Sequence, residues 1–399
     1  MKKLISILNH RRAVYTLPWF AVFLLCLSCG SGDSNSKASG PFDPNKDYFP
    51  EKVAIDYAIG FDVQYHGHWK ELKLFRHYND FVDTIVYALV QRGTPAPAGF
   101  AANRTLEVPV QQLGSLSTTH LAMFEVLDAL DHLKGVETAQ YVSSNTIQQL
   151  VSKGEAIELA PSGMLNTEIV LASGIQALLG VGYPNSQNDN YQVLESADIP
   201  VLLNADWQEK DLLGRAEWLK LVAVLLNKEK EANAYFEEIV KEYQRVLNLV
   251  ENEVEKSPLT ITGIANGDAW YVAGGNSFTY RMLQTAKVAY PWSNNESTGS
   301  IKLDFETVYA YGLKADYWMV PSNAKTLGEV LQRDSRYADF KAFKTGKVYN
   351  VYGKYTEGGG NDYYESGIVQ PHVILKDIVK IFHPQLLPNH ELVYYAPLR

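Results

Sequence analysis

Residues 212–255 read LLGRAEWLKLVAVLLNKEKEANAYFEEIVKEYQRVLNLVENEVE and decide how the rest of the chain is arranged. This stretch has no proline, and no glycine after Gly214, and its Leu, Val, Glu and Lys recur at helical spacing. It predicts one or two long helices. We therefore assign residues 208–257 to a helical element that joins the segments on either side of it.

Both flanking segments alternate strand and helix patterns, which is typical of α/β lobes with parallel sheets. In residues 109–207 we predict strands at 110–116, 135–136 and 199–203 and an amphipathic helix at 118–132. In residues 258–399 we predict strands at 259–264, 317–320 and 348–351 and helices at 279–286, 328–332 and 369–382. Two lobes joined by a long helical element leave a cleft between them.

An extension precedes these lobes at residues 51–108. Apolar residues alternate at 58–63 and 72–74 around the turn His66, Gly67, His68, and a further strand at 84–90 stops before Arg92, Gly93, Thr94 and Pro95. The pattern predicts a small antiparallel β layer.

The N-terminus has the pattern of a bacterial lipoprotein signal. Lys2, Lys3, Arg11 and Arg12 come before an apolar run at 13–27, and Leu25 to Cys29 read LCLSC. We predict a signal peptide at 1–28, lipidation of Cys29 and a flexible tether at 29–50, which is small and polar from Ser31 to Gly40. The alternative is a transmembrane anchor, for which this run falls short of the about 20 residues that a span needs.

Composition excludes several classes of function. The only cysteines are Cys26 and Cys29, so the mature chain has no disulfide and no catalytic thiol. The net charge of the chain is -9, and loss of the predicted signal would make it more negative. So acidic a chain is a poor nucleic-acid binder.

Four short motifs together resemble the class III substrate-binding proteins of ABC importers, which capture ferric siderophores, haem and cobalamin. They are SLSTTH at 115–120, AEW at 216–218, YVAGGNS at 271–277 and NDYYESG at 361–367. The resemblance implies two Rossmann-like lobes held by a rigid helix, with little hinge closure. It also implies a monomeric, lipid-anchored binding protein of the cell envelope that faces the periplasm and has neither enzymatic activity nor a resident cofactor.

The same resemblance implies docking on an ABC permease dimer through one glutamate on each lobe. Glu168, in LNTEI at 165–169, and Glu306, in LDFETV at 303–308, match the family's two motifs. Carboxylate to guanidinium pairs provide orientation and affinity at such a surface. The alternative is that each glutamate is simply favoured by its position at a helix N-terminus.

Open α/β sheets bind ligands outside the carboxyl ends of their strands. This rule selects candidate ligand contacts in both lobes: Ser117, Thr118, Thr119, His120, Tyr141, Tyr183, Trp207, Trp270, Tyr271, Asn276, Asp362, Tyr363 and Tyr364. Aromatic faces with a few polar groups suit a large flat ligand. The alternatives are that the tyrosines pack the lobes and that Thr118 or Thr119 caps a helix.

The candidate contact residues do not determine which cargo the protein binds. Anionic ferric siderophores are usually met by basic side chains, of which Arg281 and Lys354 are the nearest. Haem requires a Tyr or His axial ligand, for which Tyr141, Tyr271, Tyr363 and His120 are available. Cobalamin needs mainly aromatic stacking and amide contacts.

Two other functions are alternatives to a binding protein of an ABC importer. A metal-dependent enzyme would use His66, His68 and His77, but three histidines near a turn are more often solvated, and no phosphate-loop, zinc-helix or nucleophile-elbow motif occurs. A surface lipoprotein of the same fold that passes cargo to an outer-membrane receptor remains a second alternative.

Overall fold

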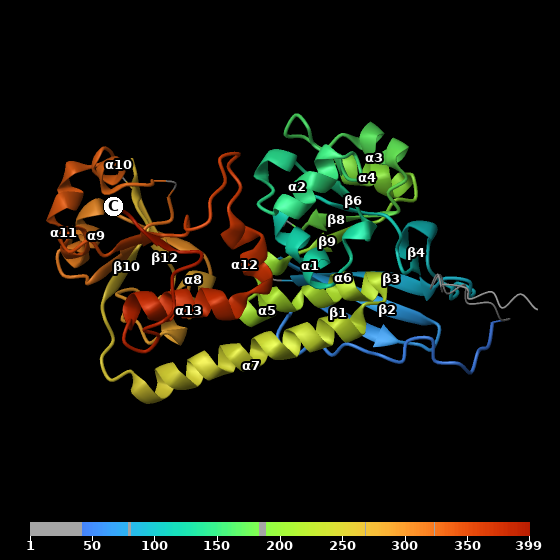
Figure 1. The fold of residues 1–399 in the computed structure, drawn as a ribbon, viewed down its shortest axis with the longest axis horizontal. Coiled ribbons are helices and arrows are strands. Elements are labelled where there is room, and N and C mark those ends of the chain that lie inside the picture. The colour runs from blue at the N-terminus through green and yellow to red at the C-terminus, as the bar shows by residue number, and fades with distance from the viewer. Residues whose placement is uncertain (1–41, 79–80, 183–188, 268, 323) are drawn as a thin grey trace, which may run out of the picture. The chain divides into compact units, whose positions relative to one another are not determined.

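The computed structural model describes residues 42–78, 81–182, 189–267, 269–322 and 324–399 (Figure 1). The predicted signal peptide, Cys29, the tether up to residue 41, and Tyr183 lie outside these residues. Below, residues 109–207 are called the first lobe and residues 258–399 the second lobe.

The N-terminal extension forms a four-stranded sheet in the order β1 (Phe61–Tyr65), β2 (Trp69–Tyr78), β3 (Phe81–Gln91) and β4 (Thr105–Val108). The pairs β1–β2 and β2–β3 are antiparallel, as predicted, but β4 runs parallel to β3. The three predicted strands thus form the expected antiparallel layer, and β4 is an additional strand that the sequence did not predict. The long connection after β3 brings the chain back so that β4 can run in the same direction.

The first lobe contains a parallel sheet of five strands in the order β7-β6-β5-β8-β9. The strands and helices in chain order are β5 (Leu113–Ser115), α1 (Leu121–Val126), β6 (Leu133–Val136), α2 (Asn145–Ser152), β7 (Ile157–Glu158), α3 (Thr167–Ser173), β8 (Ala177–Val181), α4 (Asp189–Ser196) and β9 (Val201–Asn204). The helix predicted at 118–132 is shorter than expected. Asp128 has a left-handed φ of 48°, which a continuing helix does not allow.

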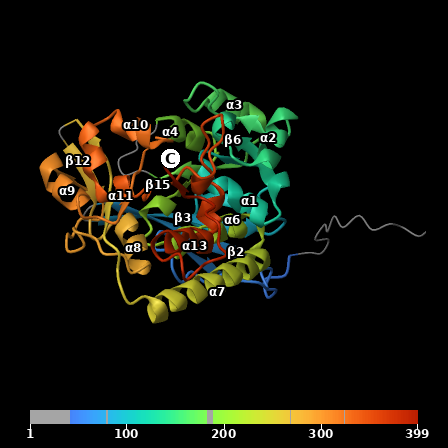
Figure 2. The ribbon, with the colours of Figure 1, turned by 60° about the vertical axis from the view of Figure 1, so that its left-hand side comes forward.

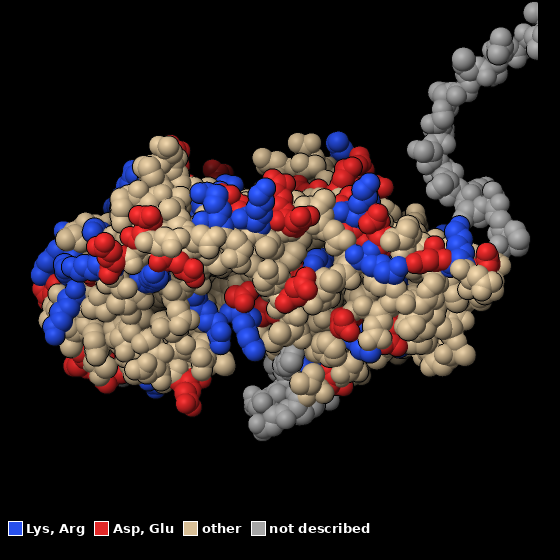
Figure 3. Space-filling model, turned by 90° about the horizontal axis from the view of Figure 1, so that it is seen from below, with Lys and Arg blue, Asp and Glu red and all other residues tan. Residues whose placement is uncertain are grey.

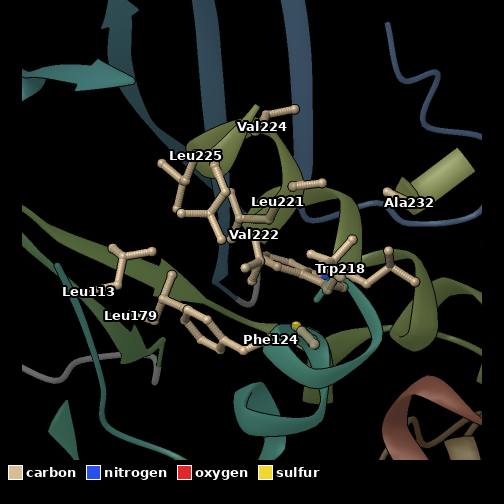
Figure 4. Packing of buried hydrophobic residues seen from close by; sticks show 14 of the residues in the cluster. Leu113, Phe124, Leu179, Trp218, Leu221, Val222, Val224, Leu225 and Ala232 are labelled. Carbon is tan, nitrogen blue, oxygen red and sulfur yellow. The ribbon is translucent and has the colours of Figure 1, made fainter. Parts of the chain in front are cut away.

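The linking stretch is helical throughout but divided into α5 (Leu212–Glu217), α6 (Leu219–Leu226) and α7 (Glu229–Glu253). Asn227 adopts a left-handed conformation and ends α6. Every residue of α6 is buried, because this helix lies in the core that it shares with the N-terminal sheet and the first lobe (Figure 4).

The second lobe is built on a sheet in the order β10-β14-β15-β16, whose first three strands are parallel and whose last is antiparallel. A smaller antiparallel sheet of β11, β12 and β13 lies in the same lobe. The strands are β10 (Thr260–Thr262), β11 (Ala265–Asn266), β12 (Ala269–Ala273), β13 (Ser300–Leu303), β14 (Tyr317–Met319), β15 (Val348–Asn350) and β16 (Ala396–Pro397). The helices are α8 (Phe278–Thr285), α9 (Phe305–Gly312), α10 (Leu327–Leu331), α11 (Lys341–Lys344) and α13 (Pro371–Phe382).

After β15 the chain crosses to the first lobe in residues 354–369, which we call the crossing segment. It contains a hairpin closed by the Tyr355 to Asn361 bridge, the 3-10 turn η7 (Asp362–Tyr364) and α12 (Ser366–Val369). α12 packs against α1, and Ile368 and Val369 belong to the first-lobe core (Figure 1). α13 then returns the chain to the second-lobe core and lies along α7 (Figure 2).

Candidate functional site

A pocket of about 360 Å³ opens at the carboxyl ends of the second-lobe strands. Every described residue of its wall lies between Thr262 and Tyr395, within the second lobe. Its aromatic and thioether wall residues are Tyr271, Phe278, Met282, Met319, Tyr349, Tyr363, Tyr364 and Tyr395. This is the place where open α/β sheets bind their ligands.

Local backbone features shape the back of the pocket. Gly263 has a φ of +85°, and a Cβ atom there would lie 2.0 Å from the Tyr271 carbonyl oxygen. Ser277 caps α8, since its hydroxyl accepts the Tyr280 N–H at 3.2 Å. The turn between β10 and β12 and the start of α8 are thus fixed by residues that cannot be exchanged freely.

Three of the pocket tyrosines, Tyr363, Tyr364 and Tyr395, form a contiguous cluster. The ring centroid of Tyr363 lies 5.0 Å from that of Tyr364 and 5.8 Å from that of Tyr395, both in edge-to-face geometry. Burial raises the pKa of Tyr349, Tyr363, Tyr364 and Tyr395 above the usual value. At neutral pH these side chains are therefore uncharged phenols.

Asp377 of α13 positions Tyr395 in the wall. This fully buried carboxylate accepts the Tyr394 N–H at 2.7 Å and the Tyr395 N–H at 3.0 Å. Tyr395 in turn directs its hydroxyl to the Met282 sulfur at 3.7 Å. A hydrogen-bonded carboxylate thus holds the C-terminal segment against the pocket.

The crossing segment connects the pocket wall with the first lobe through hydrogen bonds. Glu365 follows Tyr364 directly, is buried, and accepts the Ser143 N–H at 2.6 Å and the Ser144 N–H at 2.8 Å. A Cβ atom on Gly358 would lie 2.4 Å from the Gln140 carbonyl oxygen, so the glycine tip of the hairpin packs backbone against backbone.

Of the predicted second-lobe contacts, Tyr271, Tyr363 and Tyr364 line the pocket. Asn276 lies just outside the wall, with its amide donating to the Glu296 carbonyl oxygen, and Asp362 pairs with Lys354 at 3.3 Å. Trp270 is fully buried and donates its indole N–H to the Thr262 carbonyl oxygen at 3.0 Å. It supports the pocket from behind and does not line it.

None of the predicted first-lobe contacts that the structure describes lies in this pocket, and Tyr183 is outside the described residues. Ser117 caps the 3-10 turn η2 (Thr118–His120), where its hydroxyl accepts the Thr119 N–H at 3.2 Å. His120 is fully buried, with Nδ1 3.2 Å from the Ser115 hydroxyl, and burial lowers its pKa to about 4. Tyr141 and Trp207 are exposed but do not belong to the wall.

The two predicted docking glutamates occupy corresponding places in the lobes. Glu168 lies in the first turn of α3 and Glu306 in the first turn of α9, and both are exposed. Asn166 and Asp304 cap these two helices. A contact of Glu306 with Arg336 at 3.7 Å leaves Glu306 78 % exposed and accessible to a partner.

Among the aromatic and thioether residues of the wall, sequence reasoning missed Phe278, Met282, Met319, Tyr349 and Tyr395. Met319 ends a strand that was predicted, so the rule on carboxyl ends of strands selects it too. Tyr395 was not predictable by this rule, because its position in the wall depends on the hydrogen bond that its backbone N–H donates to Asp377.

No group of three or more His, Cys, Asp or Glu side chains suited to a metal ion occurs among the described residues. His66 stacks on Trp69 with ring centroids 4.2 Å apart, and His68 meets the edge of Phe42. The side chain of His77 lies outside the described part of the chain.

Charge is mixed over the face seen in Figure 3, where basic and acidic side chains alternate. This pattern agrees with the composition, which argues against binding to nucleic acid. Within the described ranges, no helix is both long enough and apolar enough to span a membrane.

Comparison with known proteins identifies the family. Residues 116–354 match the family described as periplasmic binding proteins. An uncharacterized lipoprotein of Methanocaldococcus jannaschii is 24% identical over 302 residues, covering 73% of this chain and 70% of that protein.

Two solved structures share the fold. A possible iron-binding periplasmic solute-binding protein from Staphylococcus epidermidis has a TM-score of 0.54 and 15% identity, over 68% of this chain and 98% of that one. A periplasmic haem-binding protein from Roseiflexus sp. has a TM-score of 0.53 and 15% identity, over 69% and 99%.

These findings confirm the predicted α/β fold and the resemblance that the sequence motifs carried. The family match also confirms that the chain is a binding protein and not an enzyme, because the matched family consists of binding proteins. Since the matched residues run through both lobes and make up more than half of the sequence, the chain belongs to the periplasmic binding protein family.

Proposed function

We propose that this protein is the lipid-anchored substrate-binding component of an ABC importer, which captures an iron complex (ferric siderophore or haem) or cobalamin and delivers it to the permease. The observation that carries the proposal is the tyrosine-rich pocket at the carboxyl ends of the second-lobe strands. Its walls suit a ring-shaped or chelated ligand better than a sugar or an amino acid, because aromatic faces dominate and polar groups are few.

Location follows from the N-terminal sequence. Lipidation of Cys29 would hold the protein in the cell envelope, facing the periplasm, with the polar tether as a spacer. The lipoprotein relative from Methanocaldococcus jannaschii supports this reading.

A binding experiment tests the proposal. Haemin, cyanocobalamin and the ferric siderophore ferrichrome are titrated separately into the protein while its intrinsic fluorescence is recorded. We expect one probe to bind with a Kd of about 1 μM or tighter, and Tyr364→Ala to weaken that binding at least about tenfold. Tyr311→Ala, which changes an exposed tyrosine outside the pocket, is the matched control. Failure of all three probes to bind would contradict the proposal.

Delivery to the permease is tested separately. Glu168→Arg combined with Glu306→Arg should leave cargo binding unchanged and abolish uptake in cells, because both substitutions place like charges against the permease arginines that the family implies. Glu237→Arg with Glu251→Arg, which reverses two exposed glutamates of α7, should not reduce uptake. Normal uptake by the first double variant would favour transfer to an outer-membrane receptor instead.

A further inference from the structure

None of the described residues of the pocket wall has a charged side chain. Three cations near the pocket have other partners. Arg281 of α8 donates its Nε–H to the Asn276 carbonyl oxygen at 3.5 Å. Arg215 bonds Asp206 at 3.0 Å and lies over the Phe278 ring, 5.1 Å from its centroid. Lys354, which the sequence offered as a partner for an anionic cargo, pairs with Asp362 instead. An anion that left water for this pocket would find no opposite charge there.

The polar groups of the inner wall are also largely occupied. The Thr262 hydroxyl contacts the Tyr290 hydroxyl at 3.0 Å and accepts the Ala273 N–H at 3.1 Å. The Asn350 amide donates to the Ala324 carbonyl oxygen at 2.6 Å. What remains for a ligand are aromatic faces, phenol hydroxyls, apolar surface and the exposed hydroxyls of Thr279, Thr298 and Ser300.

The pocket offers few side chains that could coordinate a metal. Direct binding of ferric iron by tyrosine requires the phenolate, and burial raises the pKa of Tyr349, Tyr363 and Tyr364. The exposed Tyr271 is a further phenol of the described wall. His120, the candidate histidine ligand of the first lobe, is fully buried away from the pocket wall. The described residues also offer no cluster of metal-binding side chains.

We infer that the part of the cargo that enters this pocket is an uncharged chelate or ring whose metal is already fully coordinated by the cargo itself. The inference rests on the proposed function and narrows it. It favours neutral hydroxamate siderophores and cobalamin over anionic catecholate siderophores and over haem, whose carboxylates would find no opposite charge in the described wall.

The test compares four probes on the unmodified protein: ferrichrome, a neutral trihydroxamate; ferric enterobactin, an anionic tricatecholate; cyanocobalamin; and haemin. We expect ferrichrome or cyanocobalamin to bind at least about tenfold more tightly than either of the others. The absorption spectrum of added haemin should show no tyrosinate ligation.

Two variants probe the charge requirement. Thr298→Lys puts a cation at the exposed rim of the pocket, and Met282→Lys puts one in its buried wall. Each should reduce the preference for the neutral probe at least about threefold, and the rim variant keeps the test valid if the buried one fails to fold. Met164→Lys, at a methionine that is 75 % exposed outside the pocket, should leave the preference unchanged.

The outcomes separate the two ideas. Tighter binding of ferric enterobactin or haemin, or a preference that Thr298→Lys leaves unaltered, would overturn the inference while the proposed function stands. Binding of none of the four probes would overturn the proposed function, and the inference with it.

Discussion

Replacing Glu217 with alanine is expected to lower the free energy of unfolding by about 3–5 kcal/mol. The Glu217 carboxylate is fully buried and accepts the N–H groups of Tyr57 and Ala58 at 2.7 Å each. It also pairs with Lys220 at 2.7 Å. The substitution strands a buried ammonium group and leaves backbone donors without acceptors, which are two of the most destabilising changes known.

Urea unfolding followed by circular dichroism measures this effect. Glu237→Ala, which removes an exposed carboxylate from α7, is the control and should change stability by less than about 0.5 kcal/mol. Replacing Glu217 and Lys220 together by methionine should cost less than Glu217→Ala, because no unpaired charge remains buried. A Glu217→Ala protein as stable as the control would refute the account.

The second large effect concerns the pH dependence of stability. Burial, reinforced by the neighbouring carboxylates Asp362 and Glu125, raises the pKa of Glu365 to about 7, against the lowering effect of two N–H donors. The folded protein therefore holds the Glu365 proton more tightly than the unfolded chain does. The resulting contribution to the free energy of unfolding is fully present below pH 4.5 and is lost as the pH rises through about 7. The total loss is about 3 kcal/mol.

Glu365→Gln should remove that part of the pH dependence. The stability of the natural protein minus that of the variant is expected to fall between about pH 4.5 and pH 8. Hydrogen exchange provides an independent readout, because the Ser143 and Ser144 amides lose a carboxylate acceptor in the variant while the Thr119 amide keeps its own. A stability difference that does not vary with pH would show that Glu365 titrates normally in the folded protein.

Much of the fold was predictable because local pattern and burial agree. The apolar strands at the centres of both sheets, and α13 with Pro371 at its first turn, carry unmistakable periodicity. The pairing of β4 with β3 and the break at Asn227 were not predictable. Each depends on how a connection folds back on its neighbours.

The candidate site, too, was predictable from the sequence only in part. Tyr271, Tyr363 and Tyr364 follow from the rule that ligands bind at the carboxyl ends of strands. Trp270 and His120 satisfy the same rule, yet their side chains point into the core, where Thr262 and Ser115 meet their ring nitrogens. Sequence alone does not show the direction of a side chain at a strand end.

The crossing segment has a consequence for the order in which the protein can be completed. Ile368 and Val369 fill part of the first-lobe core, although they lie close to the end of a chain of 399 residues. During synthesis the first lobe emerges long before these two side chains exist, so its core stays open until almost the whole polypeptide has been made. Completion of the first lobe therefore depends on a segment that is made late in synthesis, before α13.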